Sequence, residues 1–333
     1  MQTTQLKTKQ LGDTGLKITR VGFGAWAIGG GGWEFGWGPQ EDDQSIAAIH
    51  GALERGINWI DTAAAYGFGH SEELVGRALQ GLSERPHVFT KASLLEGPGR
   101  RVVHNLKRDS IMREAHASLE RLGVDAIDLY QIHWPIPEED IEEGWSAFAE
   151  LKQQGLVRHI GLSNFEVEQL RRIEQIAPVE TLQPQYSLIE RDIERDILPF
   201  AEQEGIGVIV YSPMGSGLLT GRMTRQRIAS MPDDDWRKLD SRFREPRRRL
   251  HRLWAPEAST RAPCTTNVVG GNSGRHRAVG AGRYGSGWPR AFRGPMARAK
   301  MCMPLMRPLA GILPPAGRVM ACTVLPALSG ADV

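Results

Sequence analysis

A repeated alternation of short apolar runs and helical patterns is the feature that most restricts how this 333-residue chain can fold. The apolar runs suit buried strands, which we expect at residues 19–24, 57–61, 87–91, 126–133, 157–162, 180–183 and 206–211. The intervals carry amphipathic helical patterns that end near a glycine, as at residues 43–53, 110–122, 138–154 and 192–204. Repeats of about 25–40 residues predict a parallel sheet with helices outside, either open or closed into a barrel.

The glycines after the first strand favour the barrel. Gly22 and Gly24 lie near the fingerprint of open dinucleotide-binding sheets, in which a Gly-rich turn starts a helix. The sequence that follows, AIGGGGWEFGWGP, has no helical period. We therefore predict a (β/α)8 TIM barrel, preceded by a small hairpin over residues 6–18.

The stretch Asn58–Glu73, NWIDTAAAYGFGHSEE, joins a predicted strand to a helix and carries two reactive side chains. Asp61 stands where the strand ends, and Tyr66 follows in a turn made by two glycines. Ser71, ahead of two glutamates, is typical of a helix N-cap. A carboxylate and a phenol on one strand-to-helix loop fit the face where such barrels carry their chemistry.

Polar residues also follow the other predicted strands. Taken singly, each has an ordinary explanation: a surface amine for Lys91, a core histidine for His133 and a helix cap for Asn164. Independent surface residues have no reason to fall at the same end of successive strands, so the set predicts one site at one mouth of the barrel. The set consists of Asp61, Lys91, His133, Ser163, Asn164, Gln183, Gln185, Tyr211 and Ser212.

Composition favours a cytoplasmic, enzyme-sized protein. With 41% hydrophobic and 24% charged residues, the chain can bury a large core. The amino-terminal sequence MQTTQLKTKQLGDTG has no apolar stretch typical of a signal peptide, and no run approaches about 18 apolar residues, so we expect no membrane association. The cysteines, at positions 264, 302 and 322, show no ligand spacing, which argues against a metal site.

Charge divides the chain near Pro246. Residues 1–246 hold 27 Lys and Arg against 37 Asp and Glu, whereas residues 247–333 hold 14 against 2. The second part has no sustained helical or strand period, and its strand-like run 267–270 comes too early for a helix pair to precede it. We therefore predict a barrel over residues 1–246 and an Arg-, Gly- and Pro-rich tail over residues 247–333.

Seven stretches, in order over roughly residues 10–246, together resemble the aldo-keto reductase family. They read LGDTGLKITRVGFGAW, GINWIDTAAAYGFGHSEELVGRAL, FTKAS, IDLYQIHWP, GLVRHIGLSNF, LQPQYSLIER and GVIVYSPMGSGLLTG. Within the family, the chain is most similar to a bacterial branch with a long Gly-rich first loop, like the inositol-utilisation and general-stress reductases. The resemblance implies an oxidoreductase that reduces aldehydes and ketones to alcohols by hydride transfer from NADPH.

The resemblance further implies a catalytic tetrad of Tyr66, Lys91, Asp61 and His133, with no metal. Tyr66 is the expected proton donor, but a phenol with a pKa of about 10 matches neutral pH poorly unless a cation favours its ionised form. Lys91 would be that cation, and Asp61 would pair with it and keep it charged. His133 would orient the carbonyl group by a hydrogen bond.

A nucleotide site is implied by the same resemblance. Ser163, Asn164 and Gln183 would hydrogen-bond the nicotinamide carboxamide, Tyr211 would stack under its ring, and the turn at 212–219 would wrap the pyrophosphate. The expected cofactor contacts are Gly24, Ala25, Trp26, Ser163, Asn164, Gln183, Tyr211, Ser212, Pro213, Met214, Gly215, Gly217 and Leu219. The expected walls of the substrate pocket are Trp26, Trp33 and Trp134, for which ordinary packing is the alternative.

The resemblance ends near Arg247, where the family continues with an eighth strand and the segment that holds the adenosine 2′-phosphate. We therefore expect the barrel to be incomplete at its carboxyl-terminal end, and NAD stays open beside NADPH as cofactor. A shifted reading frame is the favoured interpretation of the tail, ahead of a divergent barrel end and of a basic tail that binds nucleic acid.

Three functions follow from these observations. The first is a reductase that acts on a small-molecule carbonyl or alcohol substrate. The second is a regulatory module of the same fold that holds cofactor but turns over poorly, and the third is a non-functional product of a damaged gene. The natural substrate and the oligomeric state are left open.

Overall fold

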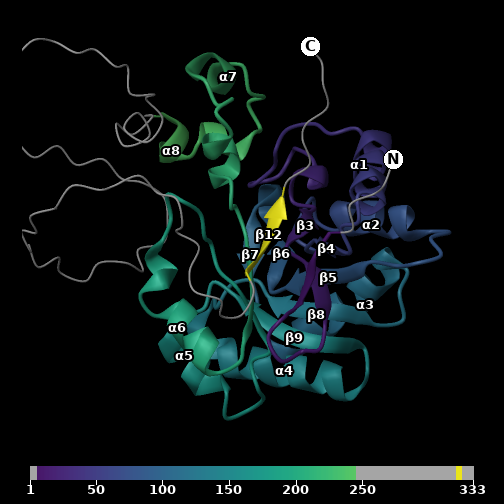
Figure 1. The fold of residues 1–333 in the computed structure, drawn as a ribbon, viewed down its shortest axis with the longest axis vertical. Coiled ribbons are helices and arrows are strands. Elements are labelled where there is room, and N and C mark those ends of the chain that lie inside the picture. The colour runs from purple at the N-terminus through teal and green to yellow at the C-terminus, as the bar shows by residue number, and fades with distance from the viewer. Residues whose placement is uncertain (1–5, 245–319, 325–333) are drawn as a thin grey trace, which may run out of the picture. The chain divides into compact units, whose positions relative to one another are not determined.

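The structure is a computed structural model that describes residues 6–244 and 320–324 (Figure 1). Eight parallel strands pair in chain order into a closed ring, in which the last strand returns to the first. The strands are β3 (Val21–Gly24), β4 (Trp59–Asp61), β5 (His87–Ala92), β8 (Ile127–Ile132), β9 (Val157–Ser163), β10 (Thr181–Gln183), β11 (Gly207–Val210) and β12 (Met320–Val324). The predicted (β/α)8 barrel is therefore confirmed.

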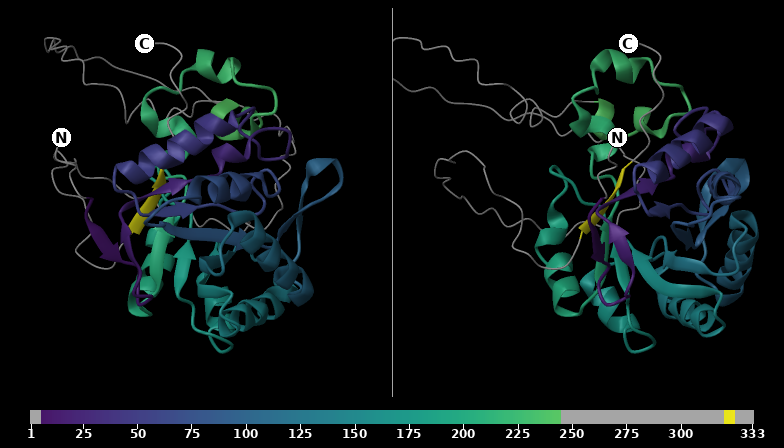
Figure 2. Two further views of the ribbon diagram at one scale, coloured as in Figure 1. Left: turned by 90° about the vertical axis from the view of Figure 1, so that its right-hand side faces the viewer. Right: turned by 45° about the vertical axis from the view of Figure 1, so that its right-hand side comes forward.

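Helices lie outside the sheet, where α1, α2, α3 and α4 pack against one another in that order (Figures 1 and 2). The α-helices are α1 (Asp42–Glu54), α2 (His70–Leu79), α3 (Arg108–Leu122), α4 (Ile141–Gln153), α5 (Val167–Ile173), α6 (Ile197–Gln203), α7 (Arg225–Ala229) and α8 (Ser241–Arg244). The 3₁₀ helices are η1 (Ala27–Gly29), η2 (Pro98–Arg100), η3 (Glu138–Asp140), η4 (Asp192–Glu194), η5 (Gly215–Thr220) and η6 (Trp236–Lys238). Of the helices in the described ranges, none has the length and apolar character needed to cross a membrane.

Two antiparallel hairpins accompany the ring. The first, β1 (Thr8–Gln10) with β2 (Lys17–Thr19), is the hairpin that the sequence predicted. Its Leu11 and Ile18 are buried against residues inside the barrel, so the hairpin closes one end of the ring. The second, β6 (Leu94–Glu96) with β7 (Val102–His104), follows β5 and was not predicted.

Most predicted strands and helices differ from the observed ones by one to three residues at their ends. The predicted strand 19–24 is shortened, because Thr19 belongs to the hairpin and β3 begins at Val21. The predicted helices 138–154 and 192–204 each begin as a 3₁₀ turn and become α-helical only at Ile141 and Ile197. A helical period in sequence does not distinguish these two helix types near an end, where 3₁₀ turns are common.

The eighth place in the ring is taken by β12, which pairs with β11 on one side and β3 on the other. No periodic pattern predicted this strand, and the candidate run 267–270 lies outside the described residues, as does most of the predicted tail. After β11, the described chain up to residue 244 forms the short helices α7 and α8 instead of one long covering helix. We expected the barrel to be incomplete at this end; the ring is instead closed by β12, while the helices described after β11 are short.

Successive side chains of each strand point alternately into and out of the ring, so the inward-pointing ones form two layers inside it. The lower layer is an apolar cluster of Leu11, Ile18, Trp59, Phe89, Leu129 and Ile209. Two residues further along β4 and β5, the same face carries Asp61 and Lys91. The apolar floor therefore supports a polar layer at the carboxyl ends of the strands.

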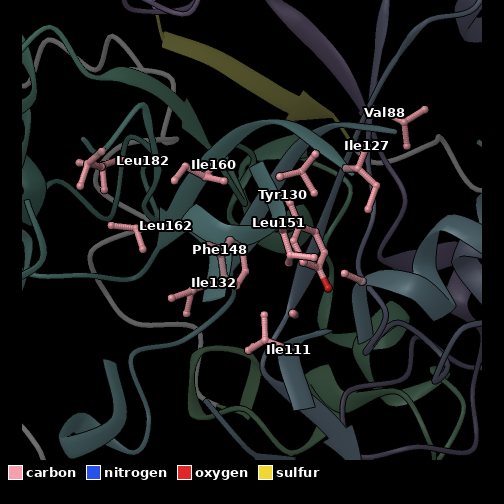
Figure 3. Packing of buried hydrophobic residues seen from close by; sticks show 14 of the residues in the cluster. Val88, Ile111, Ile127, Tyr130, Ile132, Phe148, Leu151, Ile160, Leu162 and Leu182 are labelled. Carbon is pink, nitrogen blue, oxygen red and sulfur yellow. The ribbon is translucent and has the colours of Figure 1, made fainter. Parts of the chain in front are cut away.

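The opposite face of the sheet packs against the helices in the main apolar core (Figure 3). Tyr130 of β8 stacks on Phe148 of α4 with 4.8 Å between ring centroids, and Ile111 and Leu151 belong to the same core. Full burial of such a side chain contributes about 1.5–3 kcal/mol to the free energy of unfolding. This core holds the strands rigidly beneath the polar layer.

Candidate active site

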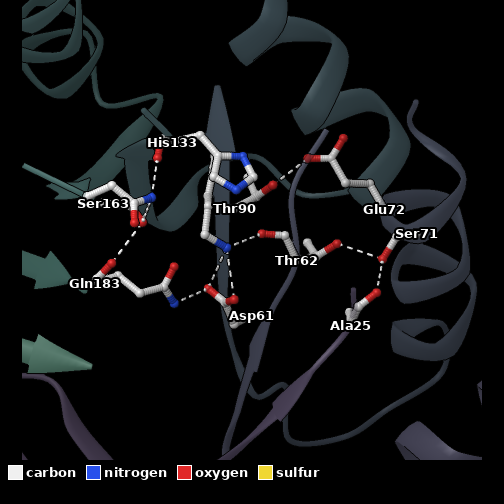
Figure 4. A network of polar contacts seen from close by, with 11 residues as sticks. Ala25, Asp61, Thr62, Ser71, Glu72, Thr90, His133, Ser163 and Gln183 are labelled. Atoms are coloured by element: carbon white, nitrogen blue, oxygen red, sulfur yellow. Dashed lines mark hydrogen bonds and ion pairs between the residues drawn. The ribbon is translucent and has the colours of Figure 1, made fainter. Parts of the chain in front are cut away.

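Asp61 and Lys91 form a buried ion pair at the carboxyl ends of β4 and β5. The Lys91 ammonium lies 2.9 and 2.8 Å from the two carboxylate oxygens of Asp61, and it also donates to the Thr62 carbonyl oxygen at 2.8 Å (Figure 4). The Lys91 side chain is 1% exposed and the Asp61 side chain is 6% exposed. Gln183 adds a fourth group, because its amide donates to Asp61 Oδ1 at 3.0 Å.

Tyr66 and His133 lie beside this pair. The Lys91 ammonium is 5.3 Å from the centroid of the Tyr66 ring, and the rings of Tyr66 and His133 meet edge to face with centroids 5.7 Å apart. All four residues of the predicted tetrad are therefore gathered at one mouth of the barrel. Their catalytic roles stay a prediction.

The electrostatics of the site differ from the expectation for Tyr66. The pKa of Tyr66 is raised well above its ordinary value by burial, and then by electrostatic interaction with Asp61 and Tyr211. Burial lowers the pKa of Lys91, against which Asp61 raises it. Burial and Asp61 therefore govern the acidity of Tyr66, which keeps its proton at neutral pH.

His133 is held as a neutral imidazole. Burial lowers its pKa well below the usual value, and electrostatic interaction with Lys91 and His104 lowers it further. Its Nδ1 atom is buried and has no hydrogen-bond partner among the described residues. A neutral imidazole offers one N–H donor and one acceptor, so His133 is able to bind a polar atom that enters the mouth.

Asn164 connects His133 with Tyr211. Its amide nitrogen donates to the His133 carbonyl oxygen at 3.0 Å and to Ser163 Oγ at 3.0 Å, while its oxygen accepts the Tyr211 hydroxyl at 2.8 Å. Ser163 in turn donates to the Gln183 carbonyl oxygen at 2.8 Å. Asn164 has a φ of +66°, a left-handed conformation that Asn tolerates better than most residues. These predicted cofactor residues form one chain of hydrogen bonds.

The turn after β11 is built from left-handed residues. Ser212, Gly215, Ser216 and Gly217 have φ values of +52°, +56°, +53° and +103°. Left-handed residues between right-handed ones turn successive backbone N–H groups toward one side, which makes a concavity for an anion such as a phosphate. The turn also contains the predicted contacts Pro213, Met214 and Leu219, whose contact with cofactor stays a prediction.

Among the described residues, Trp26 is the one predicted pocket tryptophan whose ring contacts the ring of Tyr66. Trp26 stacks on Tyr66 with 6.2 Å between centroids, at the end of β3 where Gly24 and Ala25 also lie. Trp33 packs edge to face on Phe68, 5.7 Å away. Trp134 is half-buried beside His133 and makes no ring contact with Trp26 within residues 6–244.

Trp236 is a neighbour of the site that the sequence did not reveal. Its ring stacks on Trp26 with 5.1 Å between centroids, so Trp236, Trp26 and Tyr66 form a continuous stack. The backbone N–H of Trp236 donates to the Gly36 carbonyl oxygen at 2.9 Å, which anchors this residue to the Gly- and Trp-rich loop. Because some 200 residues separate Trp236 from Trp26, no local pattern could have indicated the contact.

Thr62 is a second residue that sequence analysis missed. Its carbonyl oxygen binds Lys91, and its position directly after Asp61 was the available signal. Within the described ranges, no group of three or more His, Cys, Asp and Glu side chains is placed to hold a metal ion.

Comparisons with known proteins agree with this geometry. The sequence profile of the Aldo/keto reductase family matches residues 20–263. The chain is 42% identical to aldo-keto reductase YhdN of Bacillus subtilis (strain 168) over 239 residues, 71% of this chain and 70% of that protein. It is 39% identical to an NADH-specific methylglyoxal reductase of Escherichia coli (strain K12) over 237 residues, 67% and 72% of the two chains. The solved glycerol dehydrogenase AKR11B4 from Gluconobacter oxydans is 42% identical, covers 74% of each chain and superposes with a TM-score of 0.64.

Proposed function

The chain belongs to the aldo/keto reductase family, and on that premise we propose that it reduces small aldehydes or ketones to alcohols with Tyr66 as proton donor. A nicotinamide dinucleotide supplies the hydride in this chemistry. The observation that carries the proposal is the closed group of Tyr66, His133 and the buried Lys91–Asp61 pair at one mouth of the barrel.

Each residue of this group has a separate task in the proposal. Tyr66 holds its proton up to high pH, because burial and Asp61 raise its pKa, and it donates to the carbonyl oxygen of the substrate. Neutral His133 donates a second hydrogen bond to that oxygen and fixes the direction of the carbonyl group. Asp61 holds Lys91 in place, so that an ammonium lies behind the oxygen on which negative charge develops.

The residues of the mouth fit the nicotinamide dinucleotide. The left-handed turn of Ser212, Gly215, Ser216 and Gly217 suits a pyrophosphate, and the hydroxyl bond to Asn164 fixes the Tyr211 ring beside the mouth. Asn164, Ser163 and Gln183 lie within one hydrogen-bonded chain, whose amide and hydroxyl groups are of the kind that binds a carboxamide. We propose NADPH from the resemblance, with NADH as the alternative that the NADH-specific relative favours.

Substrates in this proposal are small carbonyl compounds. The names of two relatives, a methylglyoxal reductase and a glycerol dehydrogenase, support small oxygenated substrates for this chain as well. Trp26 forms the wall next to Tyr66, since its ring stacks on the phenol. An aromatic wall of this kind suits the apolar side of a small aldehyde.

The test is reduction of a small activated aldehyde, such as methylglyoxal or glyceraldehyde, followed by loss of the absorbance of NADPH or NADH. The full-length chain should turn over with at least one cofactor, and the Tyr66→Phe variant should not. Cofactor titration by fluorescence should give similar affinities for both proteins. A Tyr66→Phe variant that keeps most of its turnover would exclude Tyr66 as the donor.

A further inference from the structure

Helix α2 begins differently from the sequence-based expectation. Ser71 was predicted to be the N-cap, but the helix starts at His70 after Gly69, and no side chain caps it. Ser71 therefore lies inside the first turn and is fully buried. Its hydroxyl group is free to bond outside its own helix.

The Ser71 hydroxyl group joins the ends of two strands. It donates to the Ala25 carbonyl oxygen at 2.9 Å, just after β3, and lies 2.8 Å from Thr62 Oγ1, just after β4 (Figure 4). A carbonyl oxygen only accepts, so the single Ser71 proton is directed to Ala25. Thr62 must then donate its own proton to Ser71.

Each partner of Ser71 is next to a group of the active site. The Thr62 carbonyl oxygen accepts the Lys91 ammonium at 2.8 Å. The Ala25 N–H donates to the Asp61 carbonyl oxygen at 2.8 Å. The Ser71 N–H donates to the Tyr66 carbonyl oxygen at 3.1 Å, so the main chain of the proton donor is bound to the same residue.

We propose that Ser71 is a positioning residue, which holds the Tyr66 loop at a fixed distance from the Lys91–Asp61 pair. It contacts no reacting atom and acts through Tyr66, Thr62 and Ala25. The inference rests on the proposed function, since it assigns Tyr66 as the proton donor. It explains why a serine that does not cap its helix is fully buried with three hydrogen bonds.

The neighbouring Glu72 anchors the same helical turn to the next strand. Glu72 is fully buried, accepts the Thr90 hydroxyl at 2.5 Å and pairs with Arg121 at 2.6 Å. Thr90 directly precedes Lys91 on β5. The first turn of α2 is thereby fixed to β3, β4 and β5, so a displaced hydroxyl at Ser71 is not easily compensated by movement of the helix.

The first experiment compares Ser71→Ala with the full-length wild-type chain. Loss of the hydroxyl should lower kcat by about tenfold to a hundredfold, because small displacements of a catalytic group have effects of this size. The KM for the aldehyde and the Kd for NADPH should change by less than about twofold. Ser45→Ala is the matched control, since Ser45 is a buried serine in the first turn of α1 whose hydroxyl, among the described residues, donates only to the Glu41 carbonyl oxygen. It should leave kcat unchanged.

Variants of Thr62 test the path from Ser71 to Lys91. Thr62→Val removes the hydroxyl with little change in shape and should lower kcat. Thr62→Ser keeps the hydroxyl and should have the kcat of the wild type. The double variant Ser71→Ala with Thr62→Val should be no slower than the slower single variant, because both changes break one shared contact. Multiplicative losses in the double variant would refute the shared path.

A second readout does not depend on turnover. In protein labelled with [ζ-¹³C]tyrosine, the Tyr66 resonance is identified by its absence in Tyr66→Phe. Ser71→Ala should shift this resonance and its titration, and Ser45→Ala should not. If the wild-type chain reduces no aldehyde, the proposed function fails while this measurement still decides the role of Ser71.

Two results would overturn the positioning role. One is an unchanged kcat together with an unchanged Tyr66 resonance in Ser71→Ala. The other is a parallel loss of kcat, NADPH affinity and melting temperature, which would make Ser71 a structural residue only.

Discussion

Replacing Asp61 by Asn tests the ion pair on which the active site is built. Asn has nearly the shape of Asp, but it removes the charge that faces the Lys91 ammonium at 2.8 Å. The Thr62 carbonyl oxygen still accepts from Lys91. Asp61→Asn therefore leaves a buried, hydrogen-bonded cation without a counter-charge.

The effect on stability should be large. Removal of one partner from a buried pair typically costs about 3–5 kcal/mol, because the remaining charge is uncompensated. A domain has only about 5–15 kcal/mol of unfolding free energy in total. For a domain of this size, 1 kcal/mol lowers Tm by roughly 2–4 °C, so we expect a fall of about 6–20 °C at neutral pH.

The size of the loss should depend on pH. Burial lowers the pKa of Lys91 and Asp61 raises it, so without Asp61 the pKa in the folded state falls further below its ordinary value. Between the folded and unfolded pKa values, the unfolded chain binds a proton that the folded chain has lost, and stability rises with pH. The full loss of stability in Asp61→Asn is therefore present at pH values below the Lys91 pKa of the folded variant. It becomes smaller as the pH rises toward 10.5, the ordinary pKa of a lysine.

The assay is thermal unfolding of wild type and variant by circular dichroism at about pH 7 and about pH 10. Asp128→Asn is the matched control, because Asp128 is equally buried but pairs with Arg85 at 2.9 Å. Arginine does not lose its proton in proteins, so the fall in Tm of Asp128→Asn should not become smaller at about pH 10. An Asp61→Asn loss that is the same at both pH values would refute the view of Lys91 as a buried cation held by Asp61.

Three further predictions concern the donor, the cofactor site and the eighth strand. Tyr66→Phe should lower the rate of aldehyde reduction by about 10²–10⁴ in stopped-flow assays, with an unchanged Kd for NADPH. Asn164→Ala should raise that Kd by about tenfold at most, because it removes a hydrogen bond of about 0.5–1.5 kcal/mol, and an unchanged Kd beside a lost rate would assign Asn164 to holding His133. Ala321→Pro should lower Tm, because a proline inside β12 cannot donate to the ladder of hydrogen bonds. An unchanged Tm would mean that the tail does not complete the barrel and would favour the shifted reading frame.

The sequence predicted that Asp61 and Lys91 lie at one mouth of the barrel, because their positions along two parallel strands determine where their side chains point. Asp61 and Lys91 each follow an apolar residue of the inner layer by two positions, Trp59 and Phe89. A period of two puts both pairs on the inner face, and parallel strands put their ends at one mouth. The residues were therefore predictable without knowledge of any contact between them.

The contacts that connect distant loops were not predictable in this way. Trp236 reaches Trp26 because the buried Asp235–Arg237 pair, at 2.6 Å, and the Arg237 guanidinium over the Trp37 ring hold the segment against the first loop. These side chains lie in loops without period, so neither strand nor helix rules apply to them. The strand β12 was not predicted for a related reason: a five-residue strand in a sequence without repeated strand and helix patterns gives no recognisable signal.

The raised pKa of Tyr66 changes how the proposed reaction must proceed. We expected Lys91 to make the phenol a stronger acid, but the charge of Lys91 is matched by Asp61 through both carboxylate oxygens. Tyr66 is consequently a weak acid, which does not protonate a carbonyl oxygen in the ground state. An alkoxide is far more basic than a phenolate, so the proton moves only as negative charge builds up on the substrate oxygen. In this proposal, the Lys91 ammonium, 5.3 Å from the centroid of the Tyr66 ring, lies close to the phenolate that forms. It therefore stabilises the transition state more than the ground state, which is the difference that speeds a reaction.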